Sequence, residues 1–238
     1  MSLVQNNAIT TIKNKVGQIV RLLETEYGVP EWQLSDDPVS VLIETILSQN
    51  TSDTNSRDAF RSLMDSFDNW EEVAGADVDA IAHSIRCGGL GRIKAQRIKQ
   101  ALEEIMRQRG QLELDFLSQA SLAEAEDWLQ KLPGVGLKTA RCVLLFSLGR
   151  PALPVDTHIL RVSKRLGLIS PKASLEEAHR ALGELVPPED VYKFHILVIE
   201  HGRRTCQARN PKCQDCVLRK VCPSYNLYLR GSHPSSFP

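Results

Sequence analysis

Two segments of the sequence place chemically useful side chains at the start of a helix. Residues 131–140 read KLPGVGLKTA, so a Pro-Gly-Val-Gly turn interrupts a helical pattern and Lys138 falls in the first turn of the next helix. The positive end of the helix dipole and Arg141, one turn later, both disfavour an ammonium ion there. A lysine kept neutral in this way can act as a nucleophile, although an exposed surface lysine is the alternative for this pattern alone.

The turn before Lys138 has features of a phosphate site. Gly134 and Gly136 can adopt positive φ and let another molecule approach the backbone closely. The free N–H groups at the start of the next helix attract anions. Such a hairpin can hold a backbone phosphate without reading a base, but many helix pairs are joined by similar loops.

Asp156 lies just before another helix, in the segment PVDTHILRV. As an N-cap it would be kept ionised by the helix dipole and by backbone N–H groups. A helix of 11 residues from Lys138 spans about 16 Å, and the seven residues that follow cover up to about 23 Å when extended. The chain can therefore return Asp156 to the vicinity of Lys138, and capping is its alternative or additional role.

Four of the six cysteines cluster near the C-terminus with the spacing C-x6-C-x2-C-x5-C: Cys206, Cys213, Cys216 and Cys222. The sequence shows no secretion signal, so the cluster favours metal ligation over two disulfides or chance. Thiolates bind zinc as well as iron–sulfur clusters, and the spacing alone leaves the metal open. Cys87 and Cys142 lie elsewhere and are expected to be ordinary buried residues.

The charge distribution points to a polyanionic partner. Residues 131–238 hold 17 Lys/Arg against 8 Asp/Glu, whereas residues 1–130 hold 12 against 21, so the net charge of zero hides halves of +9 and −9. Lys212, Arg219 and Lys220 make the cysteine segment basic, and the segment 86–99 contains five Lys/Arg and no acid. We expect both segments to contact phosphates, with ordinary solvated faces as the alternative.

The apolar periodicity is helical nearly throughout, which predicts an all-α fold. Pro38 after Asp37 marks one helix start, and Ser121 with Glu124 forms a capping box at another. The length of 238 residues suits one large domain or two small ones. Residues 228–238 are expected to form a loose tail.

Three motifs in order, LPGVGLKTA, PVDTH and HGRRTC with its cysteine run, resemble the endonuclease III family of helix–hairpin–helix DNA glycosylases. The resemblance implies two α-helical domains flanking a DNA-binding cleft. Residues 31–150 would form a six-helix barrel with the hairpin, and residues 1–30 with 151–238 would form an iron–sulfur cluster domain. It also implies a bifunctional DNA glycosylase and AP lyase, with Lys138 as nucleophile, Asp156 as the catalytic carboxylate and the four cysteines as ligands of a [4Fe-4S] cluster.

Two further segments match the family. In LSQNTSD, residues 47–53, Gln49 or Asn50 would fill the space left by a flipped base, and in GGLGRIKA Leu90 would be an apolar wedge beside Arg92. Apart from the resemblance, Asn50 could cap a helix and Leu90 could be a core residue.

The resemblance implies a base excision repair enzyme, a monomer acting on double-stranded DNA that carries oxidised pyrimidines or abasic sites. A cytoplasmic protein of a bacterial or archaeal nucleoid is expected. The alternatives are a mismatch or photodimer glycosylase on the same scaffold, or a non-catalytic DNA-binding iron–sulfur protein.

Overall fold

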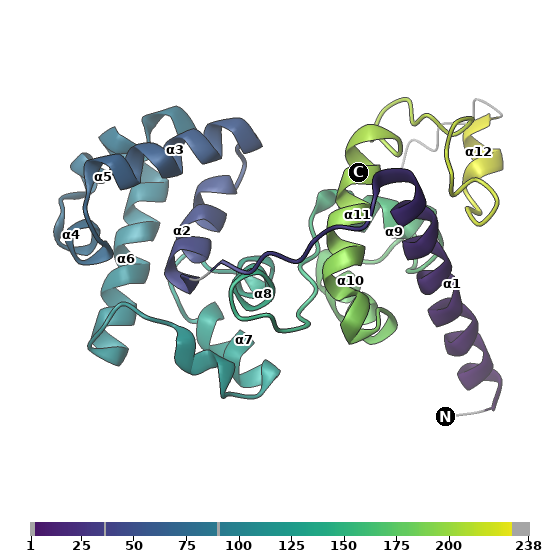
Figure 1. The fold of residues 1–238 in the computed structure, drawn as a ribbon, viewed down its shortest axis with the longest axis horizontal. Coiled ribbons are helices and arrows are strands. Elements are labelled where there is room, and N and C mark those ends of the chain that lie inside the picture. The colour runs from purple at the N-terminus through teal and green to yellow at the C-terminus, as the bar shows by residue number, and fades with distance from the viewer. Residues whose placement is uncertain (1–2, 36, 90, 230–238) are drawn as a thin grey trace. The chain divides into compact units, whose positions relative to one another are not determined.

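The structure is a computed structural model that describes residues 3–35, 37–89 and 91–229 (Figure 1). Within these residues the regular structure is entirely helical, with no strand, so the expected all-α class is confirmed. The chain divides into two compact units, Gln33–Ala152 and the combination of Met1–Trp32 with Leu153–Pro238. The expected boundaries lie two residues before these.

Unit Gln33–Ala152 carries the hairpin and the lysine. Its described part holds seven α-helices rather than the expected six, because Asn69 and Asp77 are the N-caps of two separate short helices. The helices are α2 (Pro38–Ser48), α3 (Asp53–Ser66), α4 (Trp70–Gly75), α5 (Val78–Ser84), α6 (Gly91–Arg109), α7 (Leu122–Gln130) and α8 (Leu137–Phe146), with 3-10 turns η1 (Arg86–Gly88) and η2 (Asp115–Ser118).

The expected helix starts in this unit are confirmed. The Asp37 carboxylate accepts hydrogen bonds from the backbone N–H groups of Val39 (2.9 Å) and Ser40 (3.1 Å), and Pro38 occupies the first helical position. The Trp70 indole also donates to Asp37 (2.9 Å), which ties α4 to the start of α2. Ser121 and Glu124 form both bonds of a capping box at α7.

Helix α2 lies at the centre of this unit, where it packs against α3, α6 and α8. Ile43, Ile46 and Leu47 on α2 are fully buried, together with Ile98 on α6 and Leu144 on α8. Burying an aliphatic side chain of this size stabilises the fold by about 1.5–3 kcal/mol. The core therefore fixes the end of α2 and the start of α8, where the candidate site residues lie.

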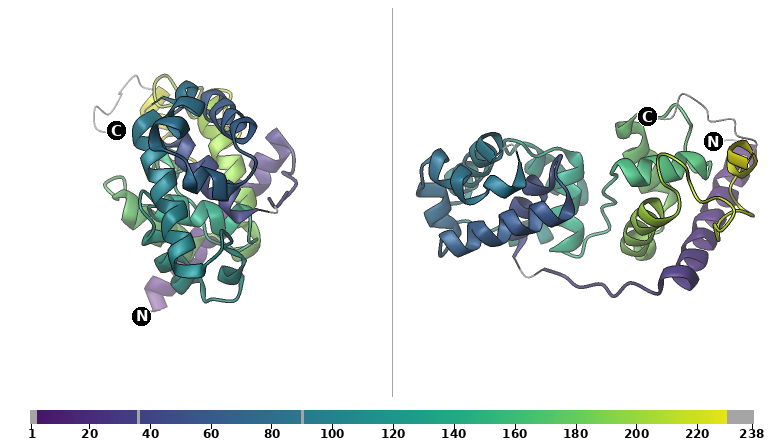
Figure 2. Two further views of the ribbon diagram at one scale, coloured as in Figure 1. Left: turned by 90° about the vertical axis from the view of Figure 1, so that its left-hand side faces the viewer. Right: turned by 90° about the horizontal axis from the view of Figure 1, so that it is seen from above.

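The second unit joins an N-terminal helix to the C-terminal third of the chain. Helix α11 packs against α9 and α1, and α1 also contacts α10, so the two distant parts of the sequence share one core (Figure 2). The helices are α1 (Leu3–Tyr27), α9 (Thr157–Arg165), α10 (Leu175–Leu185), α11 (Val191–Arg204) and α12 (Tyr225–Leu229), with a 3-10 turn η3 (Pro188–Asp190).

Candidate active site and metal centre

A tight hairpin between α7 and α8 holds the start of the lysine-bearing helix. Gly134 has φ +77°, a left-handed conformation, and a Cβ added there would lie 2.8 Å from Cδ of Arg97. Gly134 is therefore required both by its backbone and by the side chain packed on it. Gly136, in contrast, is the N-cap of α8 with φ −95°, so the expected positive φ is not used there, and its exposed backbone has no heavy atom within 4 Å of a Cβ position.

Lys138 is the second residue of α8 and is half-buried. The residues after it, Thr139 and Ala140, are buried, so the first turn of α8 is anchored in the core on its other face. The N-terminal N–H groups of a helix lack partners within the helix, and Gly136 offers no side-chain cap for them. The start of α8 thus combines a primary amine with backbone donors suited to an anion.

Arg141, which the sequence places near Lys138, is held by an acid. Its Nε donates to Glu126 Oε1 (2.8 Å) and its Nη2 to Glu126 Oε2 (3.4 Å), and both side chains are largely buried. The pair joins α8 to α7 across the hairpin. Its charge is compensated, so Arg141 is not the free cation beside Lys138 that the sequence led us to expect.

Gln49 supports the hairpin from the end of α2. Its Nε2 donates to Gly134 O (3.2 Å) and lies 3.4 Å from Thr139 Oγ1, while its Oε1 accepts from Arg97 Nη1 (2.9 Å). Gln49 was expected as a residue that fills the space of a flipped base. In this structure it braces the hairpin at Gly134, and Asn50 is the exposed polar side chain of the loop.

Asn50 adopts the left-handed conformation, with φ +53°, two residues after α2 ends. Left-handed asparagine is common just after a helix C-terminus. The caps themselves are Gln49 at the end of α2 and Ser52 at the start of α3, so the alternative role of Asn50 as a helix cap is wrong. Arg92 lies in the first turn of α6 and forms an exposed ion pair with Asp79. Leu90 lies outside the described residues.

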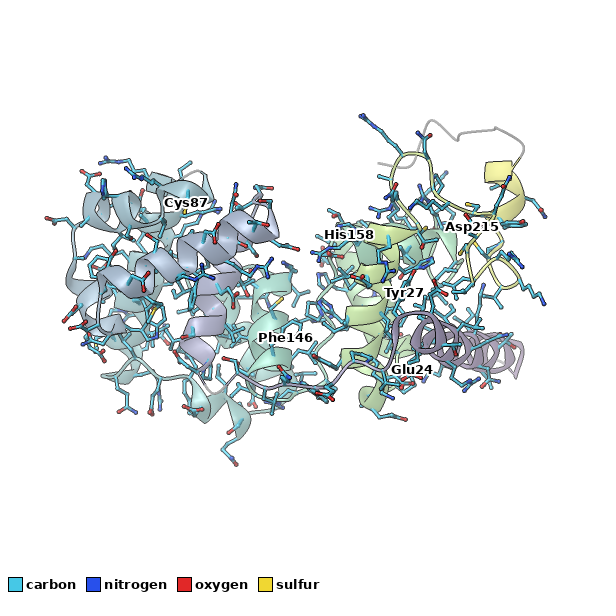
Figure 3. All side chains as sticks on the ribbon, turned by 45° about the horizontal axis from the view of Figure 1, so that its top comes forward. Glu24, Tyr27, Cys87, Phe146, His158 and Asp215 are labelled. Atoms are coloured by element: carbon cyan, nitrogen blue, oxygen red, sulfur yellow. The ribbon has the colours of Figure 1, made fainter. Side chains whose placement is uncertain are left out.

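Asp156 is the N-cap of α9, and its Oδ1 accepts a hydrogen bond from Ile159 N (2.7 Å). The expected capping role is confirmed, and the side chain remains half-buried. Next to it, burial lowers the pKa of His158, whose Nδ1 lies 3.2 Å from Arg161 Nη2 (Figure 3). Asp156 belongs to the unit of α9 and Lys138 to the unit of α8.

All four clustered cysteines line one pocket in the unit of α9 and α11, and none forms a disulfide. The loop that carries them follows α11, and Asp215 marks it in Figure 3. A zinc ion bound by thiolates at about 2.3 Å would bring their sulfurs within about 4 Å of one another. Across residues 3–35, 37–89 and 91–229, no group of three or more His, Cys, Asp or Glu side chains is placed to hold a single metal ion.

The walls of this cysteine pocket offer donors to sulfur. Arg165, only 3% exposed, places Nη1 3.4 Å from Cys206 Sγ and donates to the carbonyls of Cys206, Gln207 and Ala208 (2.7–3.3 Å). Backbone N–H groups of Leu218 and Ser224 donate to Cys216 and Cys222.

His201 connects the pocket to α1. Its Nε2 lies 3.6 Å from Cys216 Sγ and its Nδ1 lies 3.0 Å from the Tyr27 hydroxyl, which is 3.0 Å from Thr205 Oγ1. Burial lowers the pKa of His201 to about 4, so the ring is neutral at pH 7.

The chemistry of this donor set fits a cysteine-ligated cluster. Burial raises the pKa of Cys216 to about 11 and also raises the pKa values of Cys213 and Cys222, so these groups need a bound cationic centre to be deprotonated. Hydrogen bonds to the sulfurs are the protein contacts that stabilise iron–sulfur clusters. A pocket lined by four thiols therefore fits a thiolate-bound metal centre, and the choice between zinc and an iron–sulfur cluster is left to elemental analysis.

The two basic segments differ in the structure. Lys212, Arg219 and Lys220 are exposed on the cysteine loop, as a phosphate-contacting surface requires. In the segment 86–99, Arg92 and Arg97 have the partners given above, Lys94 is 1% exposed, and Lys99 Nζ donates to Ala74 O (2.7 Å) and Ala76 O (2.9 Å). Lys94 and Lys99 therefore serve internal contacts, whereas Arg86, Arg92 and Arg97 are exposed, and contact of this segment with phosphates stays a prediction.

Cys142 is buried as expected, but Cys87 is exposed, because η1 places it on the surface turn between α5 and α6 (Figure 3). Among residues 3–35, 37–89 and 91–229, no helix is long and apolar enough to cross a membrane.

Comparison with known proteins decides the family. The HhH-GPD superfamily of base excision DNA repair proteins matches residues 43–188, more than half of the chain, including Lys138 and Asp156. The chain belongs to this superfamily. Endonuclease III of Thermotoga maritima is 36% identical over 195 residues, covering 82% of this chain and 87% of that protein. A longer relative from Arabidopsis thaliana is 38% identical over 162 residues, which span 68% of this chain and 55% of that protein.

Solved structures of the superfamily agree. A non-covalent endonuclease III–DNA complex has a TM-score of 0.79 and 28% identity, and the match covers 92% of this chain and 98% of that one. The HhH-GPD match ends before the cysteine loop, whereas the match to solved endonuclease III covers nearly the whole chain. The expected resemblance to endonuclease III is confirmed, and with it the expectation of a base excision repair DNA glycosylase.

Proposed function

We propose that this protein is a bifunctional DNA glycosylase and AP lyase that removes oxidised pyrimidines from double-stranded DNA through an imine formed by Lys138. The observation that carries the proposal is the hairpin itself: a primary amine lies in the first turn of α8, directly after an exposed glycine N-cap. Binding a phosphate needs the backbone donors but not the amine. The family and the endonuclease III relatives supply the reaction class.

The proposed chemistry begins with a DNA phosphate held at the Gly134–Gly136 turn. The lone pair of Lys138 Nζ forms a bond to C1′ of the sugar while the bond from C1′ to the damaged base breaks, and the base leaves with that electron pair and takes up a proton. Opening of the sugar ring gives a protonated imine. Loss of a C2′ proton then breaks the C3′–O bond and nicks the strand 3′ to the lesion.

In this mechanism Asp156 is proposed to act through its negative charge. A carboxylate placed near the sugar stabilises the positive charge that develops as the base leaves, or accepts the proton that Lys138 releases. Its bond to Ile159 N fixes one carboxylate oxygen at the start of α9 and leaves the other for this role.

The proposed cofactor is a [4Fe-4S] cluster bound by Cys206, Cys213, Cys216 and Cys222. Its proposed role is structural: it would fix the conformation of the cysteine loop. When bound, the cluster joins the two ends of the segment 206–222 and so orders the exposed cations between them. Lys212, Arg219 and Lys220 would then meet the DNA backbone as a preformed surface. A cytoplasmic location on a bacterial or archaeal chromosome, and a monomeric state, remain predictions.

Anaerobically purified protein is expected to be yellow-brown and to contain about four irons per chain, because four cysteines line one pocket. Cys213→Ser should lose most of the iron, whereas Cys87→Ser, at an exposed cysteine outside the pocket, should retain it. Iron and zinc are measured by elemental analysis. One zinc per chain and no iron would contradict the cluster.

DNA binding is expected to weaken linearly in log affinity against log salt, with a slope of about −0.9 for each phosphate neutralised. Changing Lys212, Arg219 and Lys220 together to Gln should make the slope shallower by about two to three units. The matched control changes Arg61, Arg107 and Arg180, three exposed arginines on other helices, and should leave the slope unchanged. Equal slopes for the two triple variants would show that the cysteine loop is not part of the DNA-binding surface.

The preferred lesion is tested by base release from duplexes that carry an oxidised pyrimidine, a mismatch or a photodimer. We expect the oxidised pyrimidine to be released fastest. Faster base release from a mismatch or a photodimer would agree with the proposed chemistry but indicate a different substrate. If no base is released from any of the three duplexes and DNA binding is normal, the non-catalytic alternative is favoured.

A further inference from the structure

The most deeply buried charged side chain in the described unit of α2 and α6 belongs to Lys94. It is 1% exposed and is among the largest side chains that are fully buried. Its Nζ donates to Leu47 O (2.6 Å), in the last turn of α2, and forms a short hydrogen bond with Thr51 Oγ1. Lys94 therefore holds both ends of the loop that contains Gln49 and Asn50.

This loop has a conformation that needs support. Asn50 is exposed with φ +53°, a left-handed conformation that is sterically disfavoured for residues with a Cβ. Within the loop, Thr51 N donates to Ser48 O (3.2 Å) and Thr51 Oγ1 donates to Gln49 O (3.2 Å). Lys94 adds an anchor from a different helix, α6, at the point where these local bonds close the turn.

The same contact is costly for the fold. Burying an ammonium group removes its hydration, and burial lowers the pKa of Lys94. A cation at a helix C-terminus recovers part of this cost through the exposed carbonyls. Apolar residues often replace buried charges without loss of stability. A buried lysine in this position therefore points to a requirement for the shape of the loop rather than for stability.

We propose that Lys94 is a positioning residue for DNA engagement: it fixes the loop of residues 48–51 so that Asn50 is presented in the shape that enters the duplex when a nucleotide is extruded. Gln49 is held on the opposite side by Arg97 and Gly134, so the loop is braced by two contacts from α6 and one from the hairpin. The inference rests on the proposed function, because it assumes that this loop meets DNA.

The chain offers a matched control on the same helix. Lys99, five residues after Lys94 on α6, also donates to carbonyls at the end of a helix, those of Ala74 in the last turn of α4 and of Ala76, its C-cap. Lys94→Met and Lys99→Met each remove an ammonium group and two hydrogen bonds to other helices and keep a long apolar side chain; Lys99→Met also removes an ion pair with Glu103 on the same helix. Only Lys94→Met releases the loop that contains Asn50.

The test compares strand nicking at an abasic site in duplex DNA, where the sugar must leave the helix, with nicking at the same site in single-stranded DNA. Lys94→Met is expected to slow duplex nicking about tenfold or more and to change single-strand nicking by less than about twofold. Lys99→Met should leave both rates near the wild-type values. A purely structural role would lower both rates together and would lower the melting temperature in parallel.

A second measurement reports the loop directly. In a duplex with a non-cleavable abasic analogue opposite 2-aminopurine, side chains that enter the gap unstack the probe and raise its fluorescence. Lys94→Met should reduce this rise, and Thr51→Val, which keeps the lysine but removes one acceptor, should reduce it less. If Lys94→Met fails to fold, the Thr51→Val variant still tests the proposal, through its smaller rise in fluorescence.

The outcomes separate the inference from the proposed function. If the wild-type protein neither nicks abasic DNA nor forms a trapped adduct, the proposed function fails. If the wild-type protein does both and Lys94→Met behaves like Lys99→Met in the two assays, Lys94 is only a structural lysine and the inference is wrong.

Discussion

Replacing Lys138 by Gln is expected to abolish both strand nicking and the formation of a borohydride-trapped adduct with abasic DNA. Glutamine has no nucleophilic amine, so neither the imine nor the elimination that follows from it can occur. The backbone N–H groups at the start of α8 and the Gly134 turn do not depend on this side chain, so DNA affinity should fall by less than about threefold.

The matched control for this variant is Lys131→Gln. Lys131 is exposed and lies in the same hairpin, as the C-cap of α7. The Lys131→Gln variant therefore removes the same charge at a nearby position and leaves α8 unchanged. It should nick and trap at the wild-type rate. Normal trapping by Lys138→Gln would mean that another amine performs the chemistry and that Lys138 is a surface residue.

Asp156→Asn is expected to lower base release by about a hundredfold or more with little change in DNA affinity. Loss of one preorganised charge at a reacting centre costs about 3 kcal/mol of transition-state stabilisation. The fold should tolerate the change because Asn is as good an N-cap as Asp, so the bond to Ile159 N can remain. Single-turnover base release measures the effect, and the melting temperature reports the cap.

Asp37→Asn is the corresponding control, since Asp37 caps α2 in the other unit with the same residue type. It removes a carboxylate from a helix N-terminus that has no proposed part in the reaction, so turnover should stay within about twofold of the wild type. If Asp156→Asn and Asp37→Asn lower turnover equally, the effect at Asp156 belongs to capping and not to catalysis.

The parts of this fold that were predicted correctly depend on local chemistry. Asp37 before Pro38, the Ser121–Glu124 box and Asp156 before α9 each satisfy free N–H groups within three residues, so a short stretch of sequence is sufficient to place these helix starts. The all-α class follows from apolar periodicity for the same reason. The candidate lysine, Lys138, and the cysteine run are likewise recognised from adjacent residues.

The contacts that shape the site were not predictable, because they join residues far apart in the chain. Gln49 reaches Gly134 across 85 positions, and Lys94 reaches Leu47 across 47. Arg97 and Glu126 are ordinary charged residues in amphipathic helices, and nothing in their neighbourhood distinguishes a brace from a solvated side chain. The same holds for Arg165 and His201 around the cysteines, which only the packing of α9, α11 and α1 brings together.

The packing also divides the cations of the basic segment 86–99 between the surface and internal contacts. A run of cations without acids suggests a phosphate surface, but a helix turns each residue by about 100°, so its members face different neighbours. Lys94 faces the end of α2, Lys99 faces the end of α4 and Arg97 covers Gly134. Charge counted along the sequence therefore overestimates the charge that is available to DNA.

The most direct test of the central claim is to locate the residue that carries the DNA in the wild-type protein. Protein and abasic duplex are mixed, the imine is reduced with borohydride, and the adduct is digested and sequenced by mass spectrometry. We predict that the sugar remnant is attached to Nζ of Lys138 in the peptide that begins the α8 helix. Attachment at Lys131, at Lys94, at the N-terminal amine or at any other residue would contradict the proposed mechanism.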